Sequence, residues 1–134
     1  KDFQQLQIIR ALVVQLDLKI EVVSCPIIRE DDGLAMSSRN ALLSPKERKA
    51  ASEIYKALQV IQSNQSAWDA SKMSHYFKTK VEEKSEMTVD YFFIANTTDL
   101  IPVQSLERGI SYRIFVAVYT RKTRLIDTVE LGIM

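Results

Sequence analysis

The stretch GLAMSSRNALLSPKE, residues 33–47, separates two different kinds of pattern in this chain. Its second half, Ser44-Pro45-Lys46-Glu47, predicts the start of a helix, with serine as the cap, proline at the first position and glutamate completing a capping box. Its first half places two serines, an arginine and an asparagine behind Gly33, although the next helix already has its cap. The sequence patterns before and after this loop indicate the two parts of the fold that it connects.

Downstream of the loop, apolar residues first recur at helical spacing. A helix is predicted from Ser44, with Ala51, Ile54, Leu58 and Ile61 as its apolar stripe. A second helix is predicted over about residues 67–84, with an inward face made of Trp68, Met73, Phe77 and Val81. The polar run 63–66 joins the two helices, so the sequence predicts an αα-hairpin.

The period then changes to two. Residues 88–95, 112–120 and 124–131 predict strands, and residues 121–123 form a short hairpin link between the last two. Asp90 and Asp127 alternate with apolar neighbours in these strands, and we expect each of them to make local hydrogen bonds. Residues 34–134 therefore predict a small α+β unit, in which a helical pair precedes a three-stranded antiparallel sheet.

Upstream of the loop the pattern differs. Leu6, Ile9, Val13 and Leu16 predict an amphipathic helix over residues 3–16, and the nearly continuous apolar run 19–28 predicts a strand buried on both faces of a parallel sheet. A helix followed by a buried strand is the closing half of a βαβ unit. Because the opening half is absent from this sequence, we expect a longer parent protein and an exposed apolar face on residues 3–28.

Composition limits the function further. The chain has 134 residues, 46% of them hydrophobic and 26% charged, with a net charge of +1. This charge balance gives no electrostatic case for binding nucleic acid or a membrane surface. The single cysteine, Cys25, cannot form an internal disulfide, which fits a cytoplasmic protein, and we expect it to be buried. The single histidine, His75, is predicted to be a surface or structural residue, and no Cys/His cluster predicts a metal site.

The sequence Ser37-Ser38-Arg39-Asn40 allows two interpretations. Serine hydroxyls, loop amides and a guanidinium together could hold a polyanion such as a phosphate chain. Alternatively, Ser37 or Asn40 caps a short turn and Arg39 pairs with Asp31 or Asp32. The residue types alone leave both interpretations open.

Lys1, Asp2 and Gln5 present a similar choice. Asp2 and Gln5 are well explained as a helix cap, and Lys1 could be a solvated charge. A helix N-terminus is also a natural anion site, because its first amides are free and its dipole is positive, and a neighbouring lysine would reinforce it.

Three segments resemble the pantoate–β-alanine ligase family. They are Lys1-Asp2-Phe3-Gln4-Gln5-Leu6, then Arg29-Glu30 with the run Asp32–Asn40 and Leu43, and finally Leu125-Ile126-Asp127. They occur in the family's order, and the resemblance covers the whole chain. The nine-residue run Asp32–Asn40 is its most specific part.

The resemblance implies a nucleotidyltransferase related to class I aminoacyl-tRNA synthetases. Such an enzyme uses ATP, with Mg²⁺, to convert pantoate to pantoyl adenylate, and β-alanine then attacks to give pantothenate and AMP. Residues 1–28 would be the end of a Rossmann-like ATP-binding domain, and residues 29–134 a C-terminal lid domain carrying the phosphate-binding loop. The full-length enzyme would be a cytoplasmic homodimer acting on small molecules.

The resemblance also implies roles for particular residues. Lys1 would contact ATP phosphate, Asp2 would lie near the ribose, and Gln5 would hydrogen-bond pantoate. Ile28 would sit beside the adenine, while Ser37, Ser38 and Arg39 would bind the β- and γ-phosphates. The family's catalytic histidines, its remaining pantoate contacts and its metal-binding region have no counterpart in this sequence, so no catalytic residue or metal ligand is expected here. We therefore expect the chain to be inactive alone.

Two other classes remain open. One is a related nucleotidyltransferase with a different carboxylate substrate, and the other is a non-catalytic α+β interaction module. ATP binding that weakens on Arg39→Ala would separate both nucleotide-binding classes from the interaction module.

Overall fold

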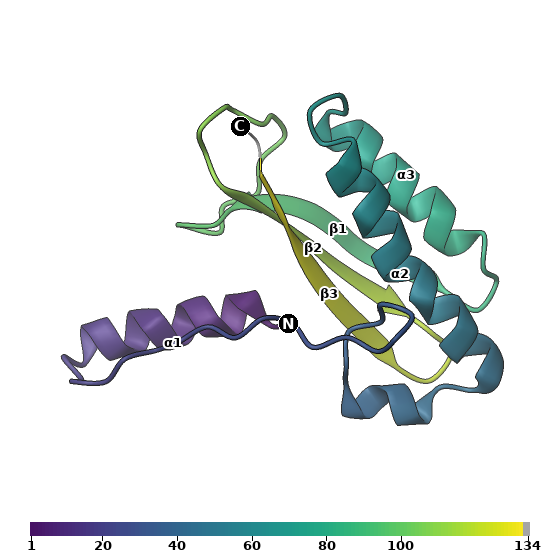
Figure 1. The fold of residues 1–134 in the computed structure, drawn as a ribbon, viewed down its shortest axis with the longest axis horizontal. Helices are drawn as coiled ribbons and strands as arrows, with labels where there is room; N and C mark the ends of the chain where they lie inside the picture. Colours follow the sequence, from purple (N-terminus) through teal and green to yellow (C-terminus); the bar gives the residue numbers. More distant parts are fainter. Residues whose placement is uncertain (133–134) are drawn as a thin grey trace.

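The computed structural model of the chain describes residues 1–132. Residues 133 and 134, the last two of the expected C-terminal domain, lie outside the described residues. The elements follow in the order α1 (Phe3–Gln15), a 3₁₀ helix η1 (Ser38–Leu42), α2 (Pro45–Ser63), α3 (Ala70–Glu82), β1 (Thr88–Asn96), β2 (Tyr112–Tyr119) and β3 (Arg124–Leu131). Figure 1 shows α2 and α3 against one side of the sheet, whereas α1 projects away from it. The predicted α+β class is confirmed.

The three strands form one antiparallel sheet in the order β1-β2-β3. Alternation along β2 directs Ile114, Val116 and Val118 into the core beneath the helices. The neighbouring side chain Phe115 lies on the opposite face, where it stacks on Phe93 with ring centroids 5.0 Å apart. The predicted antiparallel sheet and the hairpin link at residues 121–123 are therefore confirmed.

The helical pair supplies the other half of the core. All four predicted stripe residues of α2 are buried, as are Met73, Phe77 and Val81 of α3. Trp68 is only partly buried, because it precedes α3, which begins at Ala70. Asp69 sets this start, since its side chain accepts a hydrogen bond from the Lys72 amide.

The N-terminus of α2 is fixed to the far end of the sheet. Ser44 and Glu47 form the predicted capping box, and the Glu47 carboxylate also accepts a hydrogen bond of 3.0 Å from the backbone N–H of Arg121. The hydrogen bonds from Ser44, and secondarily that from Arg121, lower the pKa of Glu47 to about 2. One buried carboxylate thus joins the start of α2 to the β2–β3 turn.

The segment before the loop departs from prediction. The helix over 3–16 is confirmed, but residues 19–28 form no strand. The chain reverses after α1 and returns toward the sheet as an extended segment (Figure 1). Strand structure requires backbone hydrogen bonds to a neighbouring strand, and the described chain places none alongside. Cys25 is exposed rather than buried for the same reason.

Three contacts attach α1 to the sheet and to the loop that follows β1. The Phe3 ring lies 6.1 Å from the Phe115 ring, and the Arg113 guanidinium lies 4.5 Å above Phe3. Farther along the helix, Gln7 Nε2 donates a hydrogen bond of 2.7 Å to the Thr97 carbonyl. The first turn of α1, and with it Lys1 and Asp2, is thereby held next to the sheet.

Within residues 1–132, no helix combines the length and apolar character needed to cross a bilayer.

Candidate functional site

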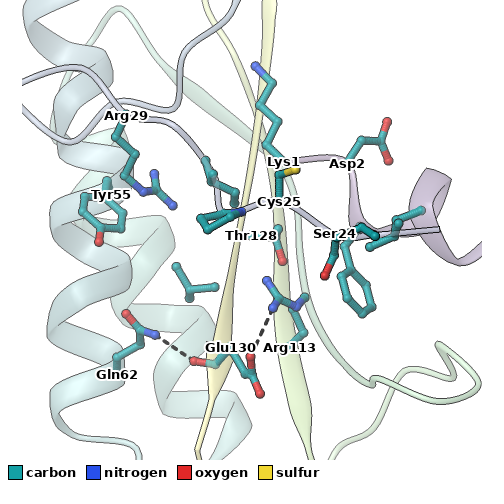
Figure 2. Close-up of a pocket in the computed structure, with 16 residues that line it drawn as sticks. Lys1, Asp2, Ser24, Cys25, Arg29, Tyr55, Gln62, Arg113, Thr128 and Glu130 are labelled. Carbon is teal, nitrogen blue, oxygen red and sulfur yellow. Dashed lines mark hydrogen bonds and ion pairs between the residues drawn. The ribbon is translucent and has the colours of Figure 1, made fainter. Parts of the chain in front are cut away.

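A cavity of about 730 Å³ lies between the start of α1 and the edge strand β3. Figure 2 shows Asp2 and Ser24 on one side and Arg29, Tyr55 and Gln62 on the other, with Lys1 and Cys25 between them. Arg113, Thr128 and Glu130 line the end remote from the Lys1 ammonium. The cavity therefore separates the α1 segment from the α2–sheet unit.

Among residues 1–132, Lys1 is the only lysine that lines this cavity. Its partial burial lowers the pKa of its ammonium group, and the nearby positive charge of Arg39 lowers it further. The carboxylates of Asp127 and Asp2 act in the opposite direction. Lys1 and Arg39, which are far apart in the sequence, thus lie close enough for their charges to interact. A multiply charged anion bound near both would offset their mutual repulsion.

The structure confirms one part of the alternative interpretation of the predicted phosphate loop, the short turn capped by Ser37. Ser37 caps η1, because its Oγ accepts a hydrogen bond of 3.2 Å from the Arg39 amide. The alternative pairing of Arg39 with Asp31 or Asp32 is not formed, since Asp32 pairs with Arg48 instead. Ser38 and Arg39 are exposed, and within residues 1–132 the Arg39 side chain has no ion pair. Ser37, Ser38 and Arg39 do not line the cavity, and their role toward a phosphate remains a prediction.

Asp2 lies at the cavity, but Gln5 and Ile28 do not line it. Asp2 accepts a hydrogen bond of 3.1 Å from the Gln5 amide and so caps α1 as its sequence predicts. The Gln5 side chain is exposed on the first turn of α1. Ile28 is 66% exposed, and its carbonyl accepts a hydrogen bond from the Met36 amide. The substrate roles of these three residues remain predictions.

Sequence reasoning missed the most buried charges of the site. Arg29 donates two hydrogen bonds to the Asp127 carboxylate, of 2.7 and 3.0 Å, and a third of 3.0 Å to the Gly33 carbonyl. Its guanidinium also stacks over the Tyr55 ring, 3.6 Å from the centroid. Asp127 therefore makes a long-range ion pair rather than only local hydrogen bonds. The sequence did contain one signal of this pair. Asp127 is a carboxylate at a core-facing position of β3, and a buried carboxylate requires a hydrogen-bonding or charged partner.

A second ion pair lies at the far end of the cavity. Arg113 contacts the Glu130 carboxylate at 3.3 Å, and burial lowers the pKa of its guanidinium. Gln62 of α2 donates a hydrogen bond of 2.7 Å to the Glu130 carbonyl (Figure 2). These contacts connect α2 to the edge strand β3 at that end of the cavity.

The remaining candidates lie apart from this constellation. His75 is exposed on α3 beside a separate, smaller cavity and does not line the one near Lys1. Among residues 1–132, no three His, Cys, Asp or Glu side chains gather so that they could hold a metal ion.

Comparison with known proteins gives a consistent result. A family model described as pantoate-beta-alanine ligase matches residues 1–130. The chain is similar to the pantothenate synthetases of Christiangramia forsetii (42% identical over 132 residues) and Thermotoga neapolitana (37% over 134 residues). Each alignment covers 98% of this chain and 47% of the relative. The chain thus spans about half the length of the curated relatives it matches.

A solved structure agrees with these relatives. The crystal structure of pantothenate synthetase from Thermus thermophilus superposes with a TM-score of 0.87 at 35% identity. The superposition covers 98% of this chain and 47% of that one. The family match extends over both the α1 segment and the α2–sheet unit. The chain belongs to the pantoate–beta-alanine ligase family.

Proposed function

We propose that this chain forms the phosphate-gripping part of an enzyme that condenses pantoate with β-alanine in a reaction driven by ATP. Membership of the family supports the reaction, and the relatives named pantothenate synthetase support the product. The observation that carries the proposal is that Lys1, which lines the cavity, lies close enough to Arg39 for that positive charge to lower the pKa of its ammonium group, although Arg39 itself does not line the cavity. Residues 1–28 would belong to a nucleotide-binding domain, and residues 29–134 to a lid that closes over it.

The proposed reaction has two steps. A pantoate carboxylate oxygen attacks the α-phosphorus of ATP, the bond to the bridging oxygen breaks, and pantoyl adenylate and pyrophosphate form. The β-alanine amine then attacks the acyl carbon, releases AMP and leaves pantothenate. Charge accumulates on the departing pyrophosphate in the first step, so groups placed to meet that charge lower the barrier.

Each site residue has a proposed part in these steps. Lys1 and Arg39 would hold the β- and γ-phosphates from opposite sides, and the hydroxyls of Ser37 and Ser38 would donate hydrogen bonds to the same oxygens. Asp2 would lie at the ribose and Ile28 at the adenine, while Gln5 would hydrogen-bond pantoate. Closure of the loop would also exclude water from the mixed anhydride.

Pyrophosphate binding by the chain tests the role of Arg39. Isothermal titration should show that Arg39→Ala weakens binding by about ten- to a hundredfold, the loss typical of one charge-assisted hydrogen bond. Arg108→Ala is the matched control, because Arg108 is an exposed arginine that lies in another loop and does not line the cavity. Equal affinities for the two variants would contradict the proposal.

We further propose that the chain does not complete the reaction alone, since the sequence resembles only part of the family's pattern and lacks its histidine motif. Mg²⁺, which would accompany ATP, is proposed to be held outside these residues. Incubation with ATP, Mg²⁺, pantoate and β-alanine should give no pantothenate, and turnover by the purified chain would refute this part of the proposal.

A further inference from the structure

The loop that carries Ser37, Ser38 and Arg39 grows out of a small hairpin. Its arms are bridged at Arg29 and Ala35, and the Glu30 amide donates a hydrogen bond of 2.8 Å to the Leu34 carbonyl. The Met36 amide closes the open end by donating to the Ile28 carbonyl at 3.0 Å. Residue 37 follows directly, so the orientation of this hairpin sets where the loop begins.

One side chain fixes the hairpin to the body of the domain. Arg29 reaches from the first arm to the Asp127 carboxylate on β3 with both terminal nitrogens. The side chain of Asp127 is 3% exposed and that of Arg29 is 16% exposed, so water competes little for this pair. The third hydrogen bond of Arg29, to the Gly33 carbonyl, connects the same guanidinium to the turn of the hairpin.

Tyr55 of α2 packs against the hairpin. Arg29 stacks on its ring, and Gly33 approaches so closely that a Cβ atom there would lie 2.4 Å from Tyr55 Cδ1. The hairpin is therefore held on three sides, by β3, by α2 and by its own turn. None of these contacts uses a residue of the proposed phosphate grip.

The far end of the loop is tied back to the same hairpin. Asn40 Nδ2 donates hydrogen bonds of 3.3 Å to Glu30 Oε1 and to the Ala35 carbonyl. Ser37, Ser38 and Arg39 thus lie between two points at which the chain is attached to the same hairpin. Lys1 belongs instead to the α1 side of the cavity. The position of this hairpin relative to α1 therefore determines the distance between Arg39 and Lys1.

We propose that Arg29 and Asp127 are positioning residues, whose ion pair sets the orientation of the Ser37–Arg39 loop toward Lys1 and a bound pyrophosphate. This inference rests on the proposed function. The hydrogen bonds that join Arg29 to Asp127, and Asn40 to Glu30 and Ala35, carry it, and the electrostatic influence of both Asp127 and Arg39 on the pKa of Lys1 agrees with it. Although Arg29 lines the cavity, both of its terminal nitrogens are engaged by Asp127, and in this proposal it acts through Arg39.

A double-mutant cycle on the chain tests this assignment, with pyrophosphate as the titrant. Arg29→Lys keeps the charge but cannot form the two-nitrogen fork, and Asp127→Asn keeps the shape but loses the charge. Each should weaken pyrophosphate binding by about tenfold. In an Arg39→Ala background neither should weaken it further. Asp90→Asn, which breaks a different arginine–aspartate pair on the sheet, is the matched control and should bind normally.

The cycle separates positioning from general destabilisation. A merely structural role would lower affinity equally with and without Arg39, and that result would overturn the inference. Unchanged affinity in Arg29→Lys, with circular dichroism showing a native fold, would also overturn it. If Asp127→Asn fails to fold, the Arg29→Lys cycle alone decides. Failure of the unsubstituted chain to bind pyrophosphate would instead overturn the proposed function, and this inference with it.

Discussion

At the scale of single residues, the site depends on close approaches that only particular side chains permit. Gly33 has a φ of +91°, and a Cβ atom at this position would lie only 2.4 Å from Cδ1 of the Tyr55 ring. Arg29 occupies the space above the same ring. Glycine at this position therefore serves both the turn and the packing, whereas the other positive-φ glycine, Gly109, has open space around it.

We predict that Gly33→Ala destabilises the chain more than Gly109→Ala. Both substitutions place a side chain in the left-handed region, which costs roughly 1–2 kcal/mol. Only the alanine at position 33 also meets Tyr55, so its free energy of unfolding should fall further. Urea denaturation of the two variants measures the difference, and equal losses would contradict the packing seen here.

At the scale of secondary-structure elements, local pattern predicted most of the fold. The periodicity of α2, α3 and the three strands indicated their existence and type, because each has a continuous apolar face that packs on the same core. The prediction of a strand over residues 19–28 was wrong. An apolar pattern indicates burial, but it cannot supply the neighbouring strand that backbone hydrogen bonding requires. The predicted exposure of residues 3–28 was confirmed at Ile8, Val14 and Val23.

The candidate site was predictable only in part. The serines and arginine of the loop stood out by composition, and Lys1 by its place before a helix. The Arg29–Asp127 pair did not, because its partners are separated by almost the whole chain and no local periodicity connects them. Long-range polar contacts follow from tertiary packing, which a single sequence does not display.

The contact between α2 and the β2–β3 turn leads to a prediction about pH. The folded-state pKa of Glu47, about 2, lies below its ordinary value of 4.5, so the stabilisation is complete above that value and is lost as pH falls toward 2. Glu47→Gln should lower the melting temperature near neutral pH, because an amide nitrogen cannot accept a hydrogen bond. The difference from the unsubstituted chain should shrink on acidification.

Thermal melts over this pH range measure the effect. Glu53→Gln provides the control, since Glu53 makes only an exposed ion pair with Lys56 on the same helix. A Glu47→Gln deficit that stays constant down to pH 2 would contradict the assigned role of the carboxylate.

At the scale of the whole molecule, two unlike parts meet at the cavity. The α2–sheet unit has a closed core, whereas α1 and residues 18–28 expose many large apolar side chains. Figure 1 shows this second part extending away from the sheet. An apolar surface of this kind is typical of a region that contacts another protein surface.

We predict that the chain self-associates through this apolar surface as its concentration rises. Substituting Val14 and Ile20, which are 80% and 61% exposed, with glutamate should reduce association in sedimentation velocity. Ile101→Glu is the matched control, because Ile101 is equally exposed but lies in the loop between β1 and β2. Association that is insensitive to the α1-segment substitutions, or equally sensitive to Ile101→Glu, would contradict the prediction.

The central claim is that Lys1 and Arg39 together hold a phosphate chain, and the ionisation of Lys1 tests it most directly. In the free chain, burial and the charge of Arg39 keep the pKa of the Lys1 ammonium below its ordinary value of 10.5. A pyrophosphate between the two cations should raise that pKa, because it favours the charged form. The measurement is a pH titration of the Lys1 side-chain ¹³Cε resonance with and without saturating pyrophosphate. A clear upward shift is predicted, and an unchanged titration would contradict the account.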